Sequence, residues 1–289
     1  MIQPPPIVLS FSANDPSGGA GVHADILTLA SLGCHPLTVI TAITVQDTAG
    51  VEELMPLDPE VVADQARAVL EDMPVQVFKI GLLGSVEIIA VIAEIISDYP
   101  DIPLVLDPVL ASGRGDELAN EDMMRAMREL LLPQVTILTP NSLEARRLSQ
   151  DDDDDDEEEE EEEEESESQI LDLSECADRL LYLGCEYVLI TGTHENTTKV
   201  VNTLYSAGGI LRTDEWDRLT HSYHGSGCTL ASAIAASIAN GLPIYDGVYE
   251  AQDYTWQALK AGFRPGMGQY LPDRLFWAND DMDKKDVES

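Results

Sequence analysis

The sequence predicts an α/β fold in which a mostly parallel sheet is covered by helices on both faces. Short runs rich in Val, Ile and Leu alternate with helical patterns along the 289 residues, and buried parallel strands have this composition. The sequence shows no internal repeat, no second core and no apolar stretch long enough to span a membrane. We therefore expect residues 1–289 to form one domain, with a disordered acidic insertion at about 150–168.

The expected elements follow one another as strand, helix, strand. Residues 7–11 are an apolar run that precedes a glycine loop and a helical pattern at 22–29, so they predict the first strand. Further buried strands are expected at residues 36–45, 75–83, 104–109, 136–139 and 187–191. Helical periodicity predicts helices at residues 59–71, 86–97, 120–132 and 173–183. Because parallel neighbours need such crossover helices, this alternation favours a parallel sheet.

The most informative segment covers residues 223–229, where two glycines lead into a helical pattern of small residues. Gly225 and Gly227 carry no Cβ, so their backbone can approach an anion closely. The start of the helix adds free N–H groups and the positive end of its dipole. We expect a phosphate-sized anion site that contains Cys228. The alternative is a tight glycine turn in which Cys228 is a small buried hydrophobic residue.

A second glycine loop, at residues 15–21, follows the first expected strand. Open α/β sheets place their ligands at this position. The loop lacks the Gly-Lys-Ser/Thr of a Walker A loop and the glycine spacing of a dinucleotide fingerprint. A ligand-binding loop of another kind and a purely structural glycine loop both remain open.

Several motifs of the chain occur in the order of one enzyme family. They are Asp15-Pro16-Ser17-Gly18-Gly19-Ala20-Gly21, Gln46-Asp47-Thr48, Lys79-Ile80-Gly81, Leu106-Asp107-Pro108-Val109, Thr139-Pro140-Asn141 and His224-Gly225-Ser226-Gly227-Cys228-Thr229. Over nearly its whole length the chain resembles hydroxymethylpyrimidine/phosphomethylpyrimidine kinases of the ribokinase-like superfamily. The resemblance implies a ribokinase-like three-layer α/β/α sandwich with a mostly parallel central sheet.

The activity implied by this resemblance is ATP-dependent phosphorylation of 4-amino-5-hydroxymethyl-2-methylpyrimidine, and then of its monophosphate, in thiamine biosynthesis. Pyridoxal kinase is an alternative, because pyridoxal is also a flat six-membered ring with a hydroxymethyl arm. A pyrimidine-binding sensor without catalytic activity is a second alternative. The resemblance also implies a homodimer.

Roles at the transferred phosphate follow from the same resemblance. The backbone N–H groups of Gly225, Ser226, Gly227 and Cys228 would hold the developing charge. Cys228 would also accept the proton of the substrate hydroxyl as a thiolate, because a helix N-terminus lowers the pKa of a thiol. Loose phosphoryl transfer depends more on charge stabilisation than on the base.

The metal ion expected with ATP is Mg²⁺, which keeps several waters and uses one or two carboxylates. We place Asp107, Asn141 and Glu144 around it. Glu144 could instead complement a helix dipole, and Asp107 could be a turn residue at a strand end.

For the pyrimidine ring we expect Gln46 to be the main contact, since a primary amide offers both a donor and an acceptor. A loop-capping amide is the alternative for this residue. The resemblance adds Asp25 and the backbone near Ala13, Leu82 and Val109. Ala13 and Leu82 replace the glycine and methionine of some relatives, and such small changes tune a pocket without abolishing it.

The nucleotide is expected near Thr191 and Thr193. Many family members have a lysine, two glycines and a histidine where this chain has Thr191-Gly192-Thr193-His194. That lysine would bring positive charge to the phosphates, so its absence bears on nucleotide affinity and on the second phosphorylation.

The composition is strongly acidic, with 54 acidic against 16 basic residues and a formal net charge of −38. Residues 151–165 are all Asp or Glu, and such a run repels itself and stays solvated. The rest of the chain is acidic too, which argues against binding of nucleic acid through a basic surface. Adaptation to high salt would explain the charge, because counterions screen self-repulsion. An acidic loop on an ordinary enzyme is the alternative.

The four cysteines, Cys34, Cys176, Cys185 and Cys228, lack the spacing of metal ligands. Reduced thiols fit a reducing compartment. The N-terminus has no basic region ahead of its first apolar run, unlike a signal peptide. We therefore expect a cytoplasmic enzyme that acts on small molecules, without a membrane or nucleic-acid partner.

Overall fold

The computed structural model describes residues 4–112, 115–150 and 171–278. Its strands are β1 Ile7–Asn14, β2 His35–Gln46, β3 Val51–Pro56, β4 Val77–Ile80, β5 Leu104–Leu106, β6 Ile137–Leu138, β7 Tyr187–Thr191, β8 Lys199–Ser206 and β9 Gly209–Asp217. Its α-helices are α1 Gly21–Ser31, α2 Pro59–Leu70, α3 Val86–Ser97, α4 Glu121–Ala126, α5 Ser142–Leu148, α6 Leu173–Tyr182, α7 Ser226–Ala239 and α8 Ile244–Lys260. A π-helical turn, Met127–Leu131, and a 3₁₀ turn, Leu132–Gln134, follow α4.

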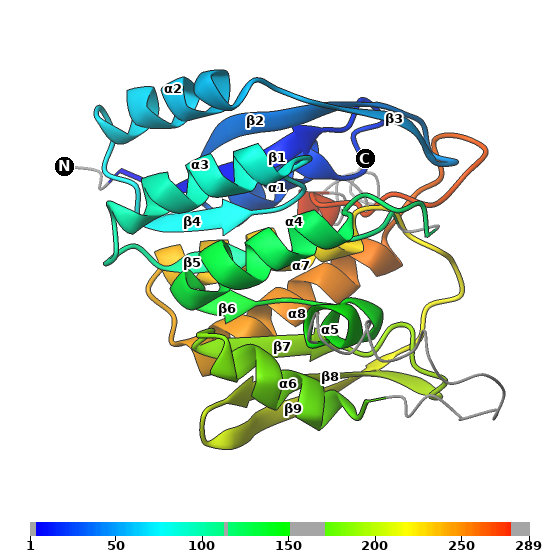
Figure 1. The fold of residues 1–289 in the computed structure, drawn as a ribbon. Helices are drawn as coiled ribbons and strands as arrows, with labels where there is room; N and C mark the ends of the chain where they lie inside the picture. The colour runs from blue at the N-terminus through cyan, green and yellow to red at the C-terminus, as the bar shows by residue number, and fades with distance from the viewer. Residues whose placement is uncertain (1–3, 113–114, 151–170, 279–289) are drawn as a thin grey trace, which may run out of the picture.

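Within these described ranges the strands form a nine-stranded sheet in the order β3-β2-β1-β4-β5-β6-β7-β8-β9 (Figure 1). Strands β2, β1, β4, β5, β6 and β7 pair in parallel, as the sequence predicts. The antiparallel strands β3, β8 and β9 extend its two edges. The prediction of a mostly parallel sheet is therefore confirmed.

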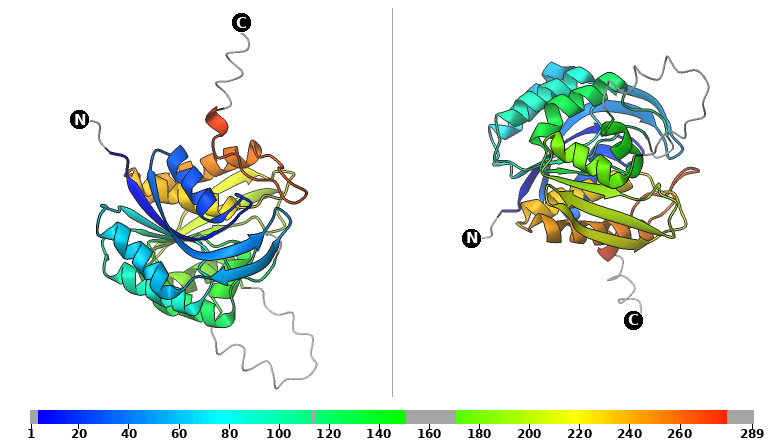
Figure 2. Two further views of the ribbon diagram at one scale, coloured as in Figure 1. Left: turned by 90° about the horizontal axis from the view of Figure 1, so that it is seen from above. Right: turned by 60° about the horizontal axis from the view of Figure 1, so that its bottom comes forward.

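Helices cover both faces of the sheet, so the molecule has three layers (Figures 1 and 2). On one face α2, α3, α4, α5 and α6 bury a large apolar cluster, to which α3 contributes Ile88, Ile89 and Ile92. Helix α3 begins where the Ser85 hydroxyl accepts a hydrogen bond from Ile88 N, a side-chain N-cap. Apolar residues three and four positions apart then face the sheet.

The other face is covered by α1, α7 and α8. Helix α7 packs against the sheet through small residues, among them Ala231, Ala233 and Ala235, which are fully buried. Alanine side chains allow a helix to approach its neighbours closely, because they fill little space. This close packing brings the first turn of α7 up to the carboxyl ends of the central strands.

Those carboxyl ends position the functional residues. Asp107 follows β5, Thr139 follows β6 and Thr191 ends β7, and all three line one cavity. Open α/β sheets bind ligands at this edge because the strand ends and helix starts meet there.

The acidic insertion expected at about 150–168 lies almost entirely outside the described residues. The described chain stops at Gln150 and resumes at Leu171. Arg146 Nε donates a hydrogen bond to the Leu171 carbonyl at 3.3 Å, so contacts of α5 hold the two flanks together. Across the described part of the chain, none of the helices has the length and apolar character to cross a membrane.

Candidate active site

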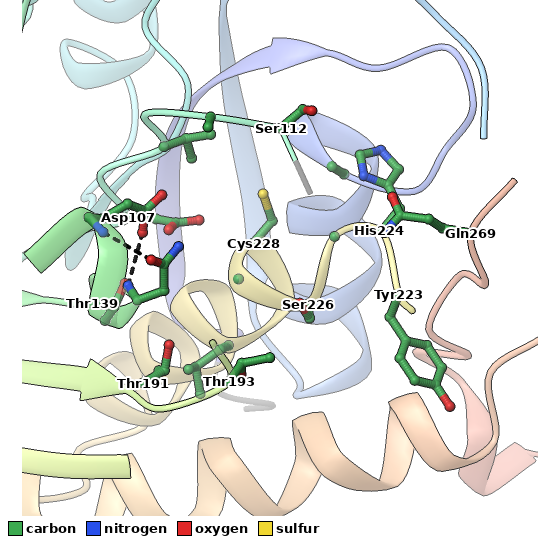
Figure 3. Close-up of a pocket in the computed structure, with 18 of the residues that line it drawn as sticks. Asp107, Ser112, Thr139, Thr191, Thr193, Tyr223, His224, Ser226, Cys228 and Gln269 are labelled. Carbon is green, nitrogen blue, oxygen red and sulfur yellow. Dashed lines mark hydrogen bonds between the residues drawn. The ribbon is translucent and has the colours of Figure 1, made fainter. Parts of the chain in front are cut away.

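A cavity of about 900 Å³ lies at the carboxyl edge of the sheet. We divide its lining residues into three neighbouring groups, each named after the ligand part expected there. We call them the ring end (Ala13, Asp15, Thr44, Gln46, Leu82, Val109, His224), the phosphate end (Asp107, Asn141, Glu144, Gly225, Ser226, Gly227, Cys228) and the nucleotide end (Thr191, Thr193, Asn202, Trp216, Arg218, Thr255, Trp256). In Figure 3, Cys228 lies between Asp107 and His224. The sequence-predicted site residues therefore converge on one cavity, with the exception of Asp25.

The phosphate end is built on the first turn of α7. Gly225 has φ 84°, a left-handed conformation that favours glycine, and a Cβ there would lie 1.8 Å from the Gly19 carbonyl oxygen. Thr229 N donates to the Gly225 carbonyl at 3.0 Å, so the N–H groups of Ser226, Gly227 and Cys228 precede the helical ladder. Free N–H groups at a helix start, together with the helix dipole, can bind an anion, which is the role that the sequence predicts for this turn.

The thiol of Cys228 is neutral in the ligand-free protein. Burial raises its pKa to about 12, and the carboxylates of Asp107 and Asp25 add to this effect although the Lys79 ammonium opposes it. The expected lowering of the thiol pKa by the helix N-terminus is therefore wrong for this state, because desolvation outweighs the dipole. Cys228 nonetheless lines the cavity, between Asp107 of the phosphate end and His224 of the ring end (Figure 3).

Asp107 has one carboxylate oxygen that the described protein leaves without a partner. Among the described residues its Oδ2 atom is buried without a hydrogen-bond partner. Burial raises the pKa of Asp107 to about 6, while Lys79 pulls it in the opposite direction. An orphaned carboxylate oxygen beside an anion site fits Mg²⁺ that is held mainly by one protein carboxylate and phosphates. The described residues contain no cluster of three or more His, Cys, Asp or Glu side chains suited to a metal.

Asn141 and Glu144 form a capping box at the start of α5. Asn141 Oδ1 accepts from Glu144 N at 3.0 Å, and Glu144 Oε2 accepts from Asn141 N at 2.9 Å. Burial and the nearby Asp107 charge raise the pKa of Glu144 to about 8. The helix-capping alternative for Glu144 thus describes its contacts, in which each of its two oxygens already accepts one backbone hydrogen bond.

Asp25 does not line the cavity, although the resemblance placed it near the substrate ring. It is fully buried, and its carboxylate pairs with Lys79 at 3.0 Å and accepts from the hydroxyls of Ser10 and Ser232. Sequence reasoning gave Lys79 no role. A lysine inside an apolar strand pattern was the available signal, because a buried ammonium requires a carboxylate partner.

The other expected ring contacts all reach the ring end. Ala13, Leu82 and Val109 line it, and the Leu82 carbonyl accepts from the Thr41 hydroxyl at 2.6 Å. Gln46 points into a hydrogen-bonded group with His224, whose importance the sequence reasoning missed. Its place directly before Gly225 in the anion motif was the signal.

At the nucleotide end, Thr191 and Thr193 line the cavity as expected. Arg218 donates hydrogen bonds to the carbonyls of Thr193 at 2.7 Å and Glu195 at 3.0 Å and also lines the cavity. Its guanidinium brings a positive charge to the loop that lacks the lysine of many relatives. This contact could not be predicted from local sequence, because Arg218 lies 25 residues further along the chain than Thr193.

Arg274 connects the two glycine loops from beneath. It is 3% exposed and donates to Thr229 Oγ1 at 3.1 Å, to the Gly225 carbonyl at 3.4 Å and to the Gly19 carbonyl. The positive charge of Arg274 therefore lies directly behind the anion site. Sequence reasoning missed it because its partners lie up to 255 residues away.

The chain is similar to known proteins over most of its length. Residues 15–273 match the family described as phosphomethylpyrimidine kinase. A hydroxymethylpyrimidine/phosphomethylpyrimidine kinase from Mycobacterium bovis is 37% identical over 274 residues, which cover 94% of each chain. A protein of the same name from Streptomyces coelicolor is 37% identical over 268 residues, 91% of this chain and 92% of that protein.

Two solved structures give the same picture. The phosphomethylpyrimidine kinase from Clostridium difficile 630 superposes with a TM-score of 0.71 at 30% identity, covering 88% of this chain and 99% of that one. An ADP complex of Bacillus subtilis pyridoxal kinase superposes with a TM-score of 0.79 at 26% identity, covering 95% and 99%. The ribokinase-like fold is therefore confirmed, and the chain belongs to the phosphomethylpyrimidine kinase family.

Proposed function

We propose that this protein transfers the γ-phosphoryl group of ATP to the hydroxymethyl oxygen of 4-amino-5-hydroxymethyl-2-methylpyrimidine, and a second phosphoryl group to the phosphate of the product. This is the activity in the names of its relatives. A relative named as a bifunctional protein of thiamine biosynthesis, from Geobacter sulfurreducens, is 34% identical over 96% of this chain, so we assign the reaction to that pathway.

One observation carries the proposal: the ring end and the start of α7 line the same cavity, in which Cys228 lies between Asp107 and His224 (Figure 3). A ring held by Gln46 would direct its hydroxymethyl arm towards the start of α7. Phosphoryl transfer needs the attacking oxygen, the phosphorus and the leaving oxygen nearly in line. Nucleotide bound against Thr191 and Thr193 would approach the same point from the opposite end of the cavity.

The backbone N–H groups of Gly225, Ser226, Gly227 and Cys228 would stabilise the charge on the transferring group. They are held rigidly by the helix and need no reorganisation. Cys228 is our candidate for the acceptor of the hydroxyl proton. Because its thiol is neutral in the ligand-free protein, any gain in its basicity would have to come with the bound reactants, and the anion site carries most of the catalysis.

Mg²⁺ would be held by Asp107, with Asn141 and Glu144 acting through its waters. When bound, it would neutralise phosphate charge. The buried Asp107 oxygen without a partner is what supports this assignment among the described residues.

Pyridoxal kinase is the second candidate, since several pyridoxal kinases share the fold at TM-scores up to 0.79. The relatives with higher identity carry the pyrimidine kinase name, at 37% against 26–27% for the pyridoxal kinases. Gln46 suits an aminopyrimidine edge, so we place the pyrimidine first.

A cytoplasmic homodimer without a nucleic-acid partner remains a prediction, and sedimentation velocity measures the oligomeric state.

A coupled assay of ATP consumption tests the proposal. The purified protein receives Mg²⁺ and ATP with the pyrimidine alcohol, its monophosphate or pyridoxal. We expect turnover with both pyrimidines, little with pyridoxal, and none after chelation of Mg²⁺. Turnover with pyridoxal alone would favour the second candidate, and binding of the pyrimidine without turnover would favour the sensor.

A further inference from the structure

His224 is the centre of a hydrogen-bonded group that joins three separate segments. Its Nε2 atom lies 2.8 Å from Asp15 Oδ2 and 2.8 Å from Gln46 Nε2. Asp15 belongs to the first glycine loop, Gln46 ends β2, and His224 precedes the anion site. One ring nitrogen therefore contacts both the glycine loop and the residue expected to read the substrate ring.

The Asp15 contact decides where the histidine proton lies. Asp15 also accepts hydrogen bonds from Ser17 N and Ala20 N, both at 2.8 Å. Burial alone would raise the pKa of Asp15. The hydrogen bonds from His224, Ser17 and Ala20 nevertheless hold this pKa below its ordinary value. An ionised carboxylate only accepts hydrogen bonds. His224 must therefore carry a proton on Nε2 and donate it to Asp15.

That proton restricts the amide of Gln46. A protonated Nε2 cannot accept a hydrogen bond, so an NH₂ group facing it sets two donors against each other. A half-turn of the amide brings Oε1 to His224 and the NH₂ group to Thr44 Oγ1, which lies 3.1 Å from the present Oε1 position. The Thr44 hydroxyl donates to the Asn14 carbonyl at 3.0 Å and is free to accept. In this orientation no two donors face each other, and Gln46 Oε1 shares the single Nε2 hydrogen of His224 with Asp15.

The position of His224 is itself fixed. Its backbone N–H donates to the Tyr270 carbonyl at 2.9 Å. A Cβ on Gly19 would lie 2.3 Å from His224 Cδ2, so the imidazole fills the space above this glycine. The side chain is 12% exposed. The imidazole therefore has little room to turn away and release the amide.

We propose that His224 is a positioning residue that determines substrate specificity, because it fixes which way the Gln46 amide faces. In the fixed orientation the carbonyl oxygen keeps one free lone pair and the NH₂ group one free hydrogen. These two groups meet the ring in a set order. An aminopyrimidine edge, with an amino donor beside a ring-nitrogen acceptor, matches that order in one pose, whereas pyridoxal has no amino group. This inference rests on the proposed function, because it takes the aminopyrimidine as the substrate ring.

A double-mutant cycle tests whether His224 acts through Gln46. Calorimetry measures the dissociation constant of the pyrimidine alcohol, without ATP, for wild type, Gln46→Ala, His224→Ala and the double variant. We expect each single variant to bind about 10-fold more weakly, the scale of one or two lost hydrogen bonds. The double variant should also be only about 10-fold weaker, because the second change removes nothing further. Additive losses of about 100-fold would overturn the proposal.

Two further variants separate positioning from folding. His224→Gln keeps an N–H donor at a similar reach and should recover most of the affinity, whereas the shorter His224→Asn should not. His224→Asn also replaces His224→Ala in the cycle if the alanine variant does not fold. His23→Ala, on the exposed side of α1, is the matched control and should bind like wild type. Equal affinities for the Gln and Asn variants would contradict a role in orienting the amide.

The double-mutant cycle tests the role of His224, and the kinase assay tests the proposed function, so either claim can be wrong without the other. Non-additive binding losses without turnover on addition of ATP would contradict the proposed function alone. Turnover with additive binding losses would overturn the role of His224 alone. Failure of the wild-type protein to bind the pyrimidine alcohol would overturn the role of His224 in positioning Gln46 for this ring.

Discussion

The ring end and the phosphate end of the cavity are built in opposite ways. At the ring end, Asp15, Thr44, Gln46 and His224 are hydrogen-bonded to one another or to the backbone. At the phosphate end, an Asp107 oxygen has no partner within the described chain, and the first N–H groups of α7 precede its hydrogen-bonded ladder. The protein itself satisfies the first region. In the second it satisfies the capping box of Asn141 and Glu144, whereas a ligand must satisfy the Asp107 oxygen and the N–H groups of α7.

The difference follows from the ligands. A neutral ring is recognised by an ordered pattern of donors and acceptors, and internal hydrogen bonds keep that pattern in place. Phosphate and its metal ion carry charges that interact strongly with protein donors and acceptors that have no partner of their own. Unpaired polar groups cost free energy in the empty protein, and this energy is regained on binding. We therefore expect changes at the phosphate end to affect turnover, and changes at the ring end to affect affinity and choice of ring.

The largest effect is expected from Gly225→Ala, at the junction of the two ends. A Cβ at this φ of 84° is strained, and it would lie 1.8 Å from the Gly19 carbonyl oxygen. The loop must move, and misplaced N–H groups should lower kcat by about 10²-fold or more. Gly241→Ala is the matched control, because Gly241 has φ 85° with open space around it. The control should lose about 1 kcal/mol of stability and keep its turnover. Equal kcat values for the two variants would contradict the account.

Cys228→Ser tests the phosphate end alone. We expect kcat to fall by about 10²-fold, the usual scale for loss of a general base, with little change in the Michaelis constant of the pyrimidine. Steady-state kinetics measures both. Cys34→Ser, remote from the cavity, is the control for exchanging a thiol for a hydroxyl. Wild-type turnover in Cys228→Ser would show that the thiol only packs.

Glu144→Gln tests whether burial at the phosphate end raises the pKa of the Glu144 carboxyl group. Because the pKa of Glu144 is raised from 4.5 to about 8, the folded protein binds this proton more tightly than the unfolded chain does. Its stabilising contribution is complete below about pH 4.5 and is lost as the pH rises towards 8. Without Mg²⁺, the free energy of unfolding of wild type minus that of Glu144→Gln should fall over this range by an amount on the order of a few kcal/mol.

A difference that stays constant from pH 5 to 8 would contradict the raised pKa. Denaturant unfolding at each pH measures it. Glu94→Gln, on the exposed side of α3, is the control and should give a constant difference.

The smallest effect is expected from deletion of residues 151–165, the run of Asp and Glu residues. The described flanks are held by Arg146 with Leu171 and by Arg179 with Ser149. Turnover should therefore stay within about twofold of wild type, since a long surface connection adds little loop-closure entropy. Solubility and salt response should change instead. A large loss of turnover at saturating Mg²⁺ and ATP would place the tract in the active site. Unfolding from low to molar salt, with and without the deletion, tests the adaptation to high salt.

The sequence predicted the central parallel strands well because their Val, Ile and Leu runs are buried on both faces. The edge strands β3, β8 and β9 escaped prediction. In β9, exposed polar residues alternate with half-buried ones, and edge strands of this kind resemble loops in composition. Fold class thus follows from the interior, whereas the edges depend on contacts between distant segments.

The same division applies to the site. The backbone anion site was predictable because glycines and a helix start are local features. Asp25 was misplaced because only the packing of α1 shows that its carboxylate faces Lys79, 54 residues further on. Arg274, Arg218 and His224 act through partners far along the chain. Local chemistry could be predicted from the sequence, and long-range pairing could not.

Phosphorus NMR of the reaction products tests the central claim most directly, that this cavity transfers two phosphoryl groups from ATP to one hydroxymethylpyrimidine. Wild-type protein with Mg²⁺, ATP and the pyrimidine alcohol should first give a phosphate monoester and then the paired signals of a diphosphate ester. Appearance of ADP should match the phosphate transferred at each step. A reaction that stops at the monoester would contradict the second transfer, and the absence of any phosphorylated pyrimidine would contradict the account as a whole.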